Sequence, residues 1–221
     1  MIRAVLFDLD GTLADSEALI AEGIRQALAE HGYEGLTVQQ VLDILGPPMT
    51  EMIPILVGPV SEERYQSIRA AYVRNYQEVQ LPSVQPLPGA VAMLDALRAQ
   101  GVPLAVVTNK IEESAHEQVA ALGWTDRFAT VIGADSAANP KPFPDPAYLA
   151  LERLGVAAED AAFVGDTTAD MECSTAAGIA VRIGITLVRT PEVLRAAGAT
   201  HTAHHLDEVT AVLLDPTPAR A

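Results

Sequence analysis

Two aspartates follow the first apolar run of the sequence. Residues 4–7 are apolar and too few for a helix, so they predict a buried strand. Asp8 and Asp10 come directly after this run, in the segment Asp8-Leu9-Asp10-Gly11-Thr12. Because ligands of open α/β sheets bind at the carboxyl ends of the strands, Asp8 stands where such a fold builds its site.

Three further runs of strand length are followed by polar side chains. Thr108 and Asn109 come after the second run, Lys141 after the third, and Asp166 and Asp170 after the fourth. The carboxyl ends of parallel strands meet at one edge of a sheet. We therefore expect acids, a hydroxyl and an ammonium group to gather at that edge.

Carboxylates gathered at one edge require a cation. If Asp8, Asp10, Asp166 and Asp170 converge, each pair of carboxylates about 4 Å apart repels by roughly 4 kcal/mol at an effective dielectric constant near 20. Oxygen ligands from few protein groups, with room for water and phosphate, favour Mg²⁺ over zinc or a fully caged calcium. Lys141 would then be a second positive charge, suited to phosphate oxygens.

A parallel sheet must position these side chains. Apolar runs of strand length alternate with helical patterns, which predicts an α/β fold with right-handed crossovers. The predicted strands are residues 4–7, 102–107, 129–132, 161–164 and 180–183, and the predicted helices between them are 91–100, 113–122, 146–154 and 169–177.

One connection is too long for this plan. Residues 8–101 lie between the first two predicted strands, whereas a complete βαβ unit takes about 30 residues. Capping signals at Ser16, Thr37 and Ser61 predict helices within this segment. The long connection is therefore expected to be a helical insert.

The composition predicts a globular protein with an acidic surface. The 221 residues include 29 acidic and 14 basic side chains, and the net charge of -15 disfavours nucleic acid and anionic membranes as partners. No apolar run reaches the 18 or so residues of a membrane span. The single cysteine, Cys173, excludes an intrachain disulfide. The start of the chain lacks the pattern of a signal peptide, which favours the cytoplasm.

The polar segments, taken in order, resemble the motifs of the haloacid dehalogenase-like hydrolase superfamily. The matching segments are Asp8-Leu9-Asp10-Gly11-Thr12, Thr108-Asn109, Lys141-Pro142 and Gly165-Asp166-Thr167-Thr168-Ala169-Asp170. The resemblance covers nearly the whole chain. It implies a Mg²⁺-dependent phosphatase that hydrolyses small phosphomonoesters through an aspartyl-phosphate intermediate, with a small phosphorylated metabolite as its partner.

The resemblance and the pattern of elements together predict two domains. A Rossmann-like parallel-sheet catalytic core takes residues 1–15 and 86–221, and a small inserted helical cap domain takes residues 16–85. Proline and glycine residues between positions 82 and 89 mark the return to the core. Residues 215–221 are expected to be disordered.

The resemblance assigns the covalent and acid–base chemistry to the first motif. It implies that Asp8 is the nucleophile and that Asp10 is the general acid and base. It also implies that the carboxylates of Asp8 and Asp166, with the backbone carbonyl of Asp10, hold the magnesium ion.

The remaining motifs are assigned to the phosphoryl group. The resemblance implies that Thr108 and Asn109 donate hydrogen bonds to it and that Lys141 neutralises its developing charge. Thr108 and Lys141 therefore count among the catalytic residues as well as the substrate-binding ones. Asp170 would orient Lys141 or a metal-bound water.

The insert carries the information on substrate. Its segment Gly46-Pro47-Pro48-Met49-Thr50-Glu51 resembles the substrate-facing loop of phosphoglycolate phosphatase-like members, so Gly46, Met49 and Thr50 are expected to bind the substrate. The insert holds no lysine, which argues against a Schiff-base phosphonatase, and Asp10 argues against a haloacid dehalogenase.

Other functions remain open at this stage. A mutase of the β-phosphoglucomutase type uses the same two aspartates. A non-catalytic phosphate-binding protein and an interaction protein are alternatives from another class. The sequence does not distinguish a monomer from a homodimer.

Several other side chains are expected to be structural. They are Trp124 and Cys173, as packing residues, and His201, His204 and His205, in a solvated loop. Asp135 is either a turn or capping residue or an outer contact of the metal site.

Overall fold

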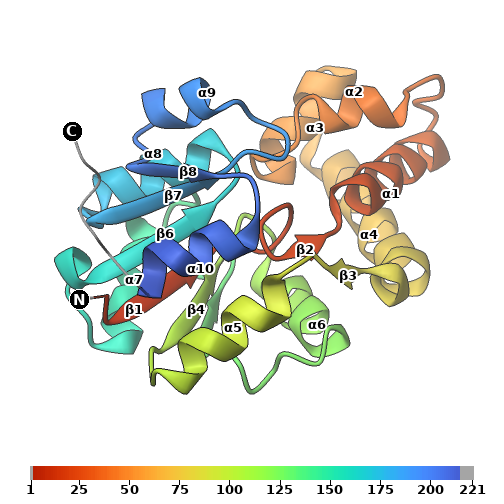
Figure 1. Ribbon diagram of the computed structural model, residues 1–221. Coiled ribbons are helices and arrows are strands. Elements are labelled where there is room, and N and C mark those ends of the chain that lie inside the picture. The colour runs from red at the N-terminus through yellow and green to blue at the C-terminus, as the bar shows by residue number, and fades with distance from the viewer. Residues whose placement is uncertain (1, 215–221) are drawn as a thin grey trace. The chain divides into compact units, whose positions relative to one another are not determined.

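The computed structural model describes residues 2–214, which form two compact units (Figure 1). One unit contains the chain up to Ala14 and again from Pro86 onward, and the other is Asp15–Gln85. The residues expected to be disordered, 215–221, lie outside the described part of the chain.

The first unit is built on a parallel sheet. Within the described residues the strand order is β5-β4-β1-β6-β7-β8, and every pair is parallel. The strands are β1 (Ala4–Phe7), β4 (Leu104–Val107), β5 (Thr130–Ile132), β6 (Ala161–Gly165), β7 (Val181–Ile185) and β8 (His201–Ala203). In the centre, Leu6 of β1 is in register with Ala105 on one side and Phe163 on the other. The strands that end in the polar motifs are therefore neighbours.

Helices cover both faces of this sheet. They are α5 (Ala90–Ala99), α6 (Glu112–Ala121), α7 (Asp145–Leu154), α8 (Thr168–Ala176), α9 (Pro191–Ala196) and α10 (Leu206–Leu214), with a short 3₁₀ turn η3 (Ala158–Asp160). Val5 and Phe7 pack in one apolar cluster with residues of α5, α6 and α10, whereas Leu6 packs in a second cluster with residues of α7 and α8. This alternation explains why β1 is apolar at every position.

The observed sheet confirms the predicted α/β fold. The five predicted strands are present, but β8 and the helices on either side of it were not predicted. The expectation that His201 lies in a solvated loop is wrong, because this residue begins β8 and is half-buried. His204 and His205 follow the strand and are exposed, with their rings 4.8 Å apart.

Two residues expected to pack in the core do so. Trp124 is buried and lies edge-on to Phe128, with the ring centroids 6.4 Å apart. Cys173 is buried in the apolar cluster under α7 and α8, and burial raises the pKa of its thiol to about 12. The thiol is therefore a packing group and not a nucleophile.

The second unit is helical. Its elements are α1 (Glu17–Glu30), α2 (Val38–Leu42), α3 (Met49–Val57), α4 (Glu62–Asn75), a π-helical turn η1 (Tyr76–Gln80) and a 3₁₀ turn η2 (Leu81–Ser83). Thr37 forms a capping box with Gln40, and the Ser61 hydroxyl accepts a hydrogen bond from Arg64 N–H. The short strands β2 (Ala14–Asp15) and β3 (Gln85–Pro86) pair where the chain passes between the units.

One expectation about the insert is wrong. The segment 46–51 is not a continuous loop, because α3 begins at Met49. Pro48 is the N-cap of this helix and Pro54 lies inside it. The sequence pattern does not predict this helix, because proline normally stops a helix.

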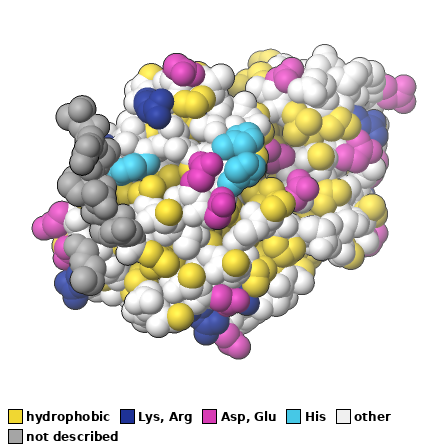
Figure 2. All heavy atoms as spheres, viewed as in Figure 1, with side chains coloured by type: hydrophobic (Ala, Val, Ile, Leu, Met, Phe, Trp, Pro, Cys, Tyr) yellow, Lys and Arg dark blue, Asp and Glu magenta, His cyan; other side chains and the backbone are white. Residues whose placement is uncertain are grey.

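The surface agrees with the acidic composition. On the face in Figure 2, basic side chains are few and lie apart from one another. Among residues 2–214, no helix combines the length and the apolar character that crossing a membrane requires. The cytoplasmic location stays a prediction.

Candidate active site

The segment Asp8–Thr12 forms a tight turn at the carboxyl end of β1. The N–H of Asp8 donates to the carbonyl of Val164 at 2.9 Å, which ties the end of β1 to β6. Gly11 has a φ of 76°, and a Cβ atom there would lie 2.8 Å from Asp166 Oδ2. Thr12 is buried and its hydroxyl donates to Asp166 Oδ1 at 2.8 Å. The motif therefore presents Asp8 and also holds the side chain of Asp166 through Thr12. The sequence analysis did not predict this contact of Thr12.

Three carboxylates converge between β1 and β6. One oxygen each from Asp8, Asp166 and Asp170 lies within 4.8 Å of the others, and all three side chains are buried. Burial raises the pKa of Asp8 to about 7; Lys141 offsets part of this rise, while Asp170 and Asp10 add to it. Buried oxygen ligands that repel one another fit a hard divalent cation such as Mg²⁺.

Lys141 lies against the same carboxylates. Its Nζ is 2.6 Å from Asp170 Oδ1 and 3.0 Å from Asp8 Oδ1, and it donates to the carbonyl of Val107 at 2.9 Å. Burial by itself would lower the pKa of Lys141, but Asp170 and Asp8 outweigh this and hold the pKa above its usual value. The ammonium group is therefore charged and fixed beside Asp8.

Asp170 holds Lys141 in place. Asp170 is the third residue of α8, and its Oδ2 accepts hydrogen bonds from the N–H of Thr167 at 2.9 Å and its hydroxyl at 2.6 Å. Its other oxygen contacts Lys141. A Cβ atom at Gly165 would lie 2.4 Å from Asp170 Cγ, so only glycine leaves room for this carboxylate.

The β4 motif lies beside the lysine. The Thr108 N–H donates to the carbonyl of Ile132 at 3.0 Å, and its hydroxyl accepts from the N–H of Lys110 at 3.2 Å. The side-chain amide of Asn109 donates to the backbone carbonyl of Lys141 at 3.1 Å. The structure thus brings both residues to the edge at which Asp8 and Lys141 stand.

The carboxylate of Asp10 contacts two residues that follow β4 in the chain, Lys110 and Gln118. Its Oδ1 accepts a hydrogen bond from Gln118 Nε2 at 2.8 Å, and its Oδ2 is 3.2 Å from Lys110 Nζ. The sequence analysis missed both partners. Lys110 was signalled by its place next to Thr108-Asn109, whereas Gln118 carried no signal, because the buried face of α6 also contains the polar Ser114.

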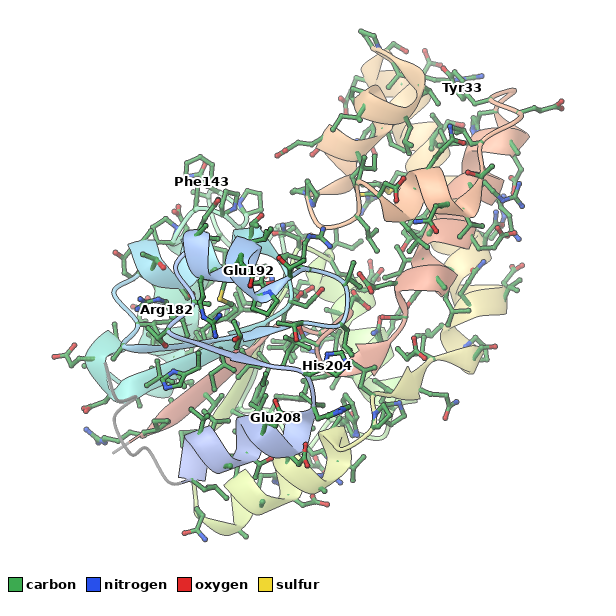
Figure 3. The ribbon with its side chains drawn as sticks, turned by 45° about the horizontal axis from the view of Figure 1, so that its top comes forward. Tyr33, Phe143, Arg182, Glu192, His204 and Glu208 are labelled. Atoms are coloured by element: carbon green, nitrogen blue, oxygen red, sulfur yellow. The ribbon has the colours of Figure 1, made fainter. Side chains whose placement is uncertain are left out.

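Several other residues singled out in the sequence have contacts or places of their own in the structure. Asp135 accepts a hydrogen bond from Glu112 N–H at 2.8 Å, so it caps α6, as expected of a capping residue. His204 and Glu208, labelled in Figure 3, are joined by a hydrogen bond from the backbone N–H of His204 at 2.9 Å. The substrate residues expected in the insert belong to the second unit, where Met49 and Thr50 begin α3 and Gly46 precedes it.

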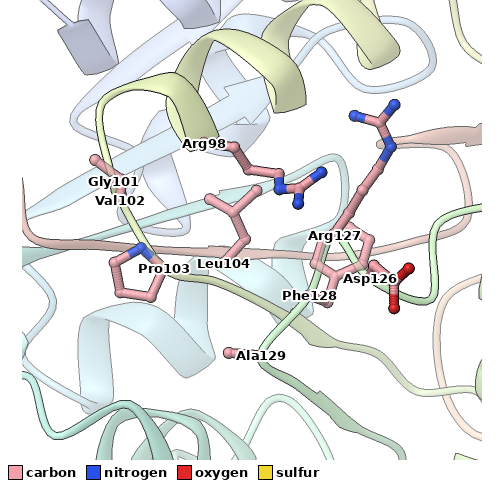
Figure 4. A pocket seen from close by; sticks show the side chains of 9 residues that line it. All are labelled: Arg98, Gly101, Val102, Pro103, Leu104, Asp126, Arg127, Phe128 and Ala129. Carbon is pink, nitrogen blue, oxygen red and sulfur yellow. The ribbon is translucent and has the colours of Figure 1, made fainter.

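A surface pocket of about 300 Å³ lies elsewhere (Figure 4). It is lined by Arg98 of α5 and by residues 101–104 and 126–129, which precede or begin β4 and β5. Arg127 in this pocket forms an ion pair with Asp95. The pocket is therefore at the amino ends of the strands, and the polar cluster at the carboxyl ends is the better candidate site.

Comparison with known proteins identifies the family. Residues 5–183 match the model of the haloacid dehalogenase-like hydrolases. The probable phosphatase IndB of Dickeya dadantii is 38% identical over 197 residues, covering 87% of this chain and 85% of that protein. A phosphoglycolate phosphatase of Xylella fastidiosa is 34% identical over 177 residues, covering 80% and 77%.

The solved structures agree. A protein from Bacteroides fragilis described as haloacid dehalogenase-like has a TM-score of 0.88 at 26% identity, covering 95% of this chain and 100% of that one. The fold and the site define a hydrolase built on a parallel sheet flanked by helices. The chain belongs to the haloacid dehalogenase-like hydrolases, and it is an enzyme of the phosphatase class. This confirms the resemblance seen in the motifs.

Proposed function

We propose that the protein is a Mg²⁺-dependent phosphatase that hydrolyses small phosphomonoesters through an aspartyl-phosphate intermediate. The observation that supports this most is the buried cluster of Asp8, Asp166 and Asp170, with Lys141 Nζ 3.0 Å from Asp8. A nucleophilic carboxylate beside a cation site and a fixed ammonium group is suited to attack on a charged phosphoryl group.

The carboxylates of Asp8 and Asp166 and the backbone carbonyl of Asp10 are the proposed magnesium ligands. Bound Mg²⁺ would supply positive charge to the phosphoryl oxygens. Lys141 adds a second charge, and Thr108 and Asn109 donate hydrogen bonds to the same group. These residues position the phosphorus in line with an Asp8 oxygen.

In the first half-reaction, an Asp8 oxygen forms a bond to phosphorus while the bond to the leaving oxygen breaks. The leaving oxygen keeps that electron pair and takes a proton from Asp10. In the second half-reaction, water attacks the phosphorus and gives its proton to Asp10. The bond between phosphorus and Asp8 then breaks, releasing inorganic phosphate and the free carboxylate.

For the substrate we propose a short phosphorylated carboxylic acid such as phosphoglycolate. The support is the relative of that name and the similar segment around Gly46, Met49 and Thr50, which we propose as substrate contacts. We propose that the second unit acts as the cap domain and that the first unit carries out the phosphoryl chemistry.

The test is a screen of small phosphomonoesters with and without Mg²⁺, using wild type and Asp8→Asn. We expect phosphate release that depends on Mg²⁺ and falls by at least about 10³ in Asp8→Asn, since an amide is a poor nucleophile and metal ligand. Full activity of Asp8→Asn, or of wild type in excess chelator, would overturn the proposal. Isomerisation of β-glucose 1-phosphate much faster than phosphate release would identify a mutase.

A further inference from the structure

We propose that Gln118 is the positioning residue of the acid–base carboxylate Asp10. The inference rests on the proposed function, because it concerns the proton that Asp10 exchanges with the leaving group. It assigns to a residue of α6, outside all the strand-end motifs, control over the orientation of the Asp10 carboxylate.

The surroundings of Gln118 support this role. The side chain is fully buried on α6, next to Ala115 and Val119 of the apolar cluster. A buried amide without a partner is costly, so a polar side chain at this position needs a defined hydrogen bond. Its Nε2 donates to Asp10 Oδ1 at 2.8 Å, across 108 positions of the sequence. The contact therefore joins α6 to the turn after β1.

The direction of this hydrogen bond restricts the orientation of the Asp10 carboxylate. The amide nitrogen is only a donor, so Asp10 Oδ1 must act as its acceptor and cannot point a hydroxyl proton at it. The other oxygen, Oδ2, is 3.2 Å from Lys110 Nζ, and an ammonium group is also only a donor. The Gln118 contact also opposes rotation of the carboxylate. The two donors together fix the orientation of the Asp10 carboxylate.

A leaving-group comparison tests this role. An alkyl phosphomonoester needs the proton from Asp10 when its alkoxide departs, whereas p-nitrophenyl phosphate releases a stable phenolate without one. The value of kcat/KM includes only the steps up to departure of the leaving group. Loss of positioning should therefore lower kcat/KM for the alkyl ester selectively, while a general loosening of the fold should lower it for both esters.

The main variant is Gln118→Met, which keeps the length of the side chain and removes the donor. We expect kcat/KM for 2-phosphoglycolate to fall about 10- to 100-fold, the scale of a hydrogen bond to a charged group, with little change for p-nitrophenyl phosphate. Val119→Ala is the matched control, because it removes packing from the same helix without touching Asp10. In this variant, the ratio of kcat/KM for 2-phosphoglycolate to kcat/KM for p-nitrophenyl phosphate should equal the wild-type ratio.

Equal losses on both esters in Gln118→Met would overturn the inference and leave Gln118 a structural residue. If Gln118→Met does not fold, Gln118→Asn gives the same comparison, because its amide is one methylene too short to reach Asp10. Asp10→Asn distinguishes a failure of this inference from a failure of the proposed function. An Asp10→Asn enzyme that hydrolyses 2-phosphoglycolate at the wild-type rate would refute the proposed function itself.

Discussion

Lys141 lies in an arrangement that is costly for stability. A buried ammonium group between Asp8 and Asp170 loses its hydration, and such groups stabilise a fold no better than apolar residues of similar volume. Removing one member is different, because it leaves the remaining charges buried without compensation. The arrangement therefore makes the stability of the fold depend on the charges that we propose for the reaction.

Lys141→Met tests this dependence. The variant leaves Asp8 and Asp170 buried beside each other, and we expect the free energy of unfolding to fall by about 3–5 kcal/mol in chelator. Urea unfolding measures the loss, and added Mg²⁺ should recover part of it. Arg25→Met is the control, because the Arg25–Glu22 pair is about one-third exposed on both sides and should contribute less than about 1 kcal/mol. Equal losses in the two variants would contradict this view.

The raised pKa of Asp8 predicts a pH dependence of metal binding. Because this pKa is about 7 in the folded protein, the carboxyl group holds a proton below that pH and must lose it before a cation binds. The affinity for Mg²⁺ should therefore weaken as the pH falls, approaching about tenfold per pH unit well below the pKa. Calorimetric titration between about pH 8 and about pH 5 measures this. An affinity independent of pH in that range would show that Asp8 is not a ligand.

At the level of elements, the same capping device occurs in both units. Thr167 caps α8 through a capping box with Asp170, and Thr37 caps α2 through one with Gln40. In α8 the partner is also the carboxylate that holds Lys141. A local helix-start signal is thereby connected to the candidate site.

Thr167→Ala and Thr37→Ala form a matched pair. Each loses a cap, and each should destabilise the protein by about 1 kcal/mol. Only Thr167→Ala also removes a hydrogen bond at 2.6 Å from Asp170, so only this variant should lower kcat on small phosphomonoesters. Thermal unfolding and steady-state kinetics on both proteins make the comparison. Equal kcat values in the two variants would separate the cap from the reaction.

The sequence predicted those elements whose pattern is continuous. The apolar run 4–7 gave β1 with its observed ends, because a strand buried on both faces has no polar positions. The strand β8 was missed because His201-Thr202-Ala203 is short and mostly polar, and α3 was missed because of Pro48 and Pro54. These elements depend on neighbours that the local sequence does not show.

The candidate site was likewise predicted only in part. Asp8, Lys141 and Asp166 follow strands, and the topology of a parallel sheet brings such positions together without further information. Gln118 is in the middle of a helix, and only the packing of α6 brings its amide to Asp10. Contacts of this kind could not be predicted from motifs or from local periodicity.

For the molecule as a whole, the chromophores are divided between the two units. The only tryptophan, Trp124, is buried in the first unit, which also holds the three converging aspartates. The second unit contains four of the five tyrosines. Tryptophan fluorescence therefore reports on the unit with the proposed magnesium site.

Magnesium should raise the unfolding temperature seen by Trp124. A concentration about 100 times the dissociation constant stabilises the binding state by about 2.7 kcal/mol, which corresponds to a shift on the order of 5–10 °C for a unit of this size. Asp166→Asn should abolish the shift. An unchanged wild-type transition at saturating Mg²⁺ would refute the proposed site, while the tyrosine signal measures how far the units unfold together.

The pairing of β2 with β3 has a consequence for how the chain tolerates change. Both crossings between the units are held side by side in a two-stranded sheet, so the insert leaves and re-enters the first unit at nearly one point. The entropy of closing such a loop grows only with the logarithm of its length, by about 0.6 kcal/mol for each doubling. Inserts of very different size can therefore occupy this position at small thermodynamic cost. Recombination at these two strands offers a route by which descendants of one catalytic scaffold acquire new substrates without rebuilding the sheet.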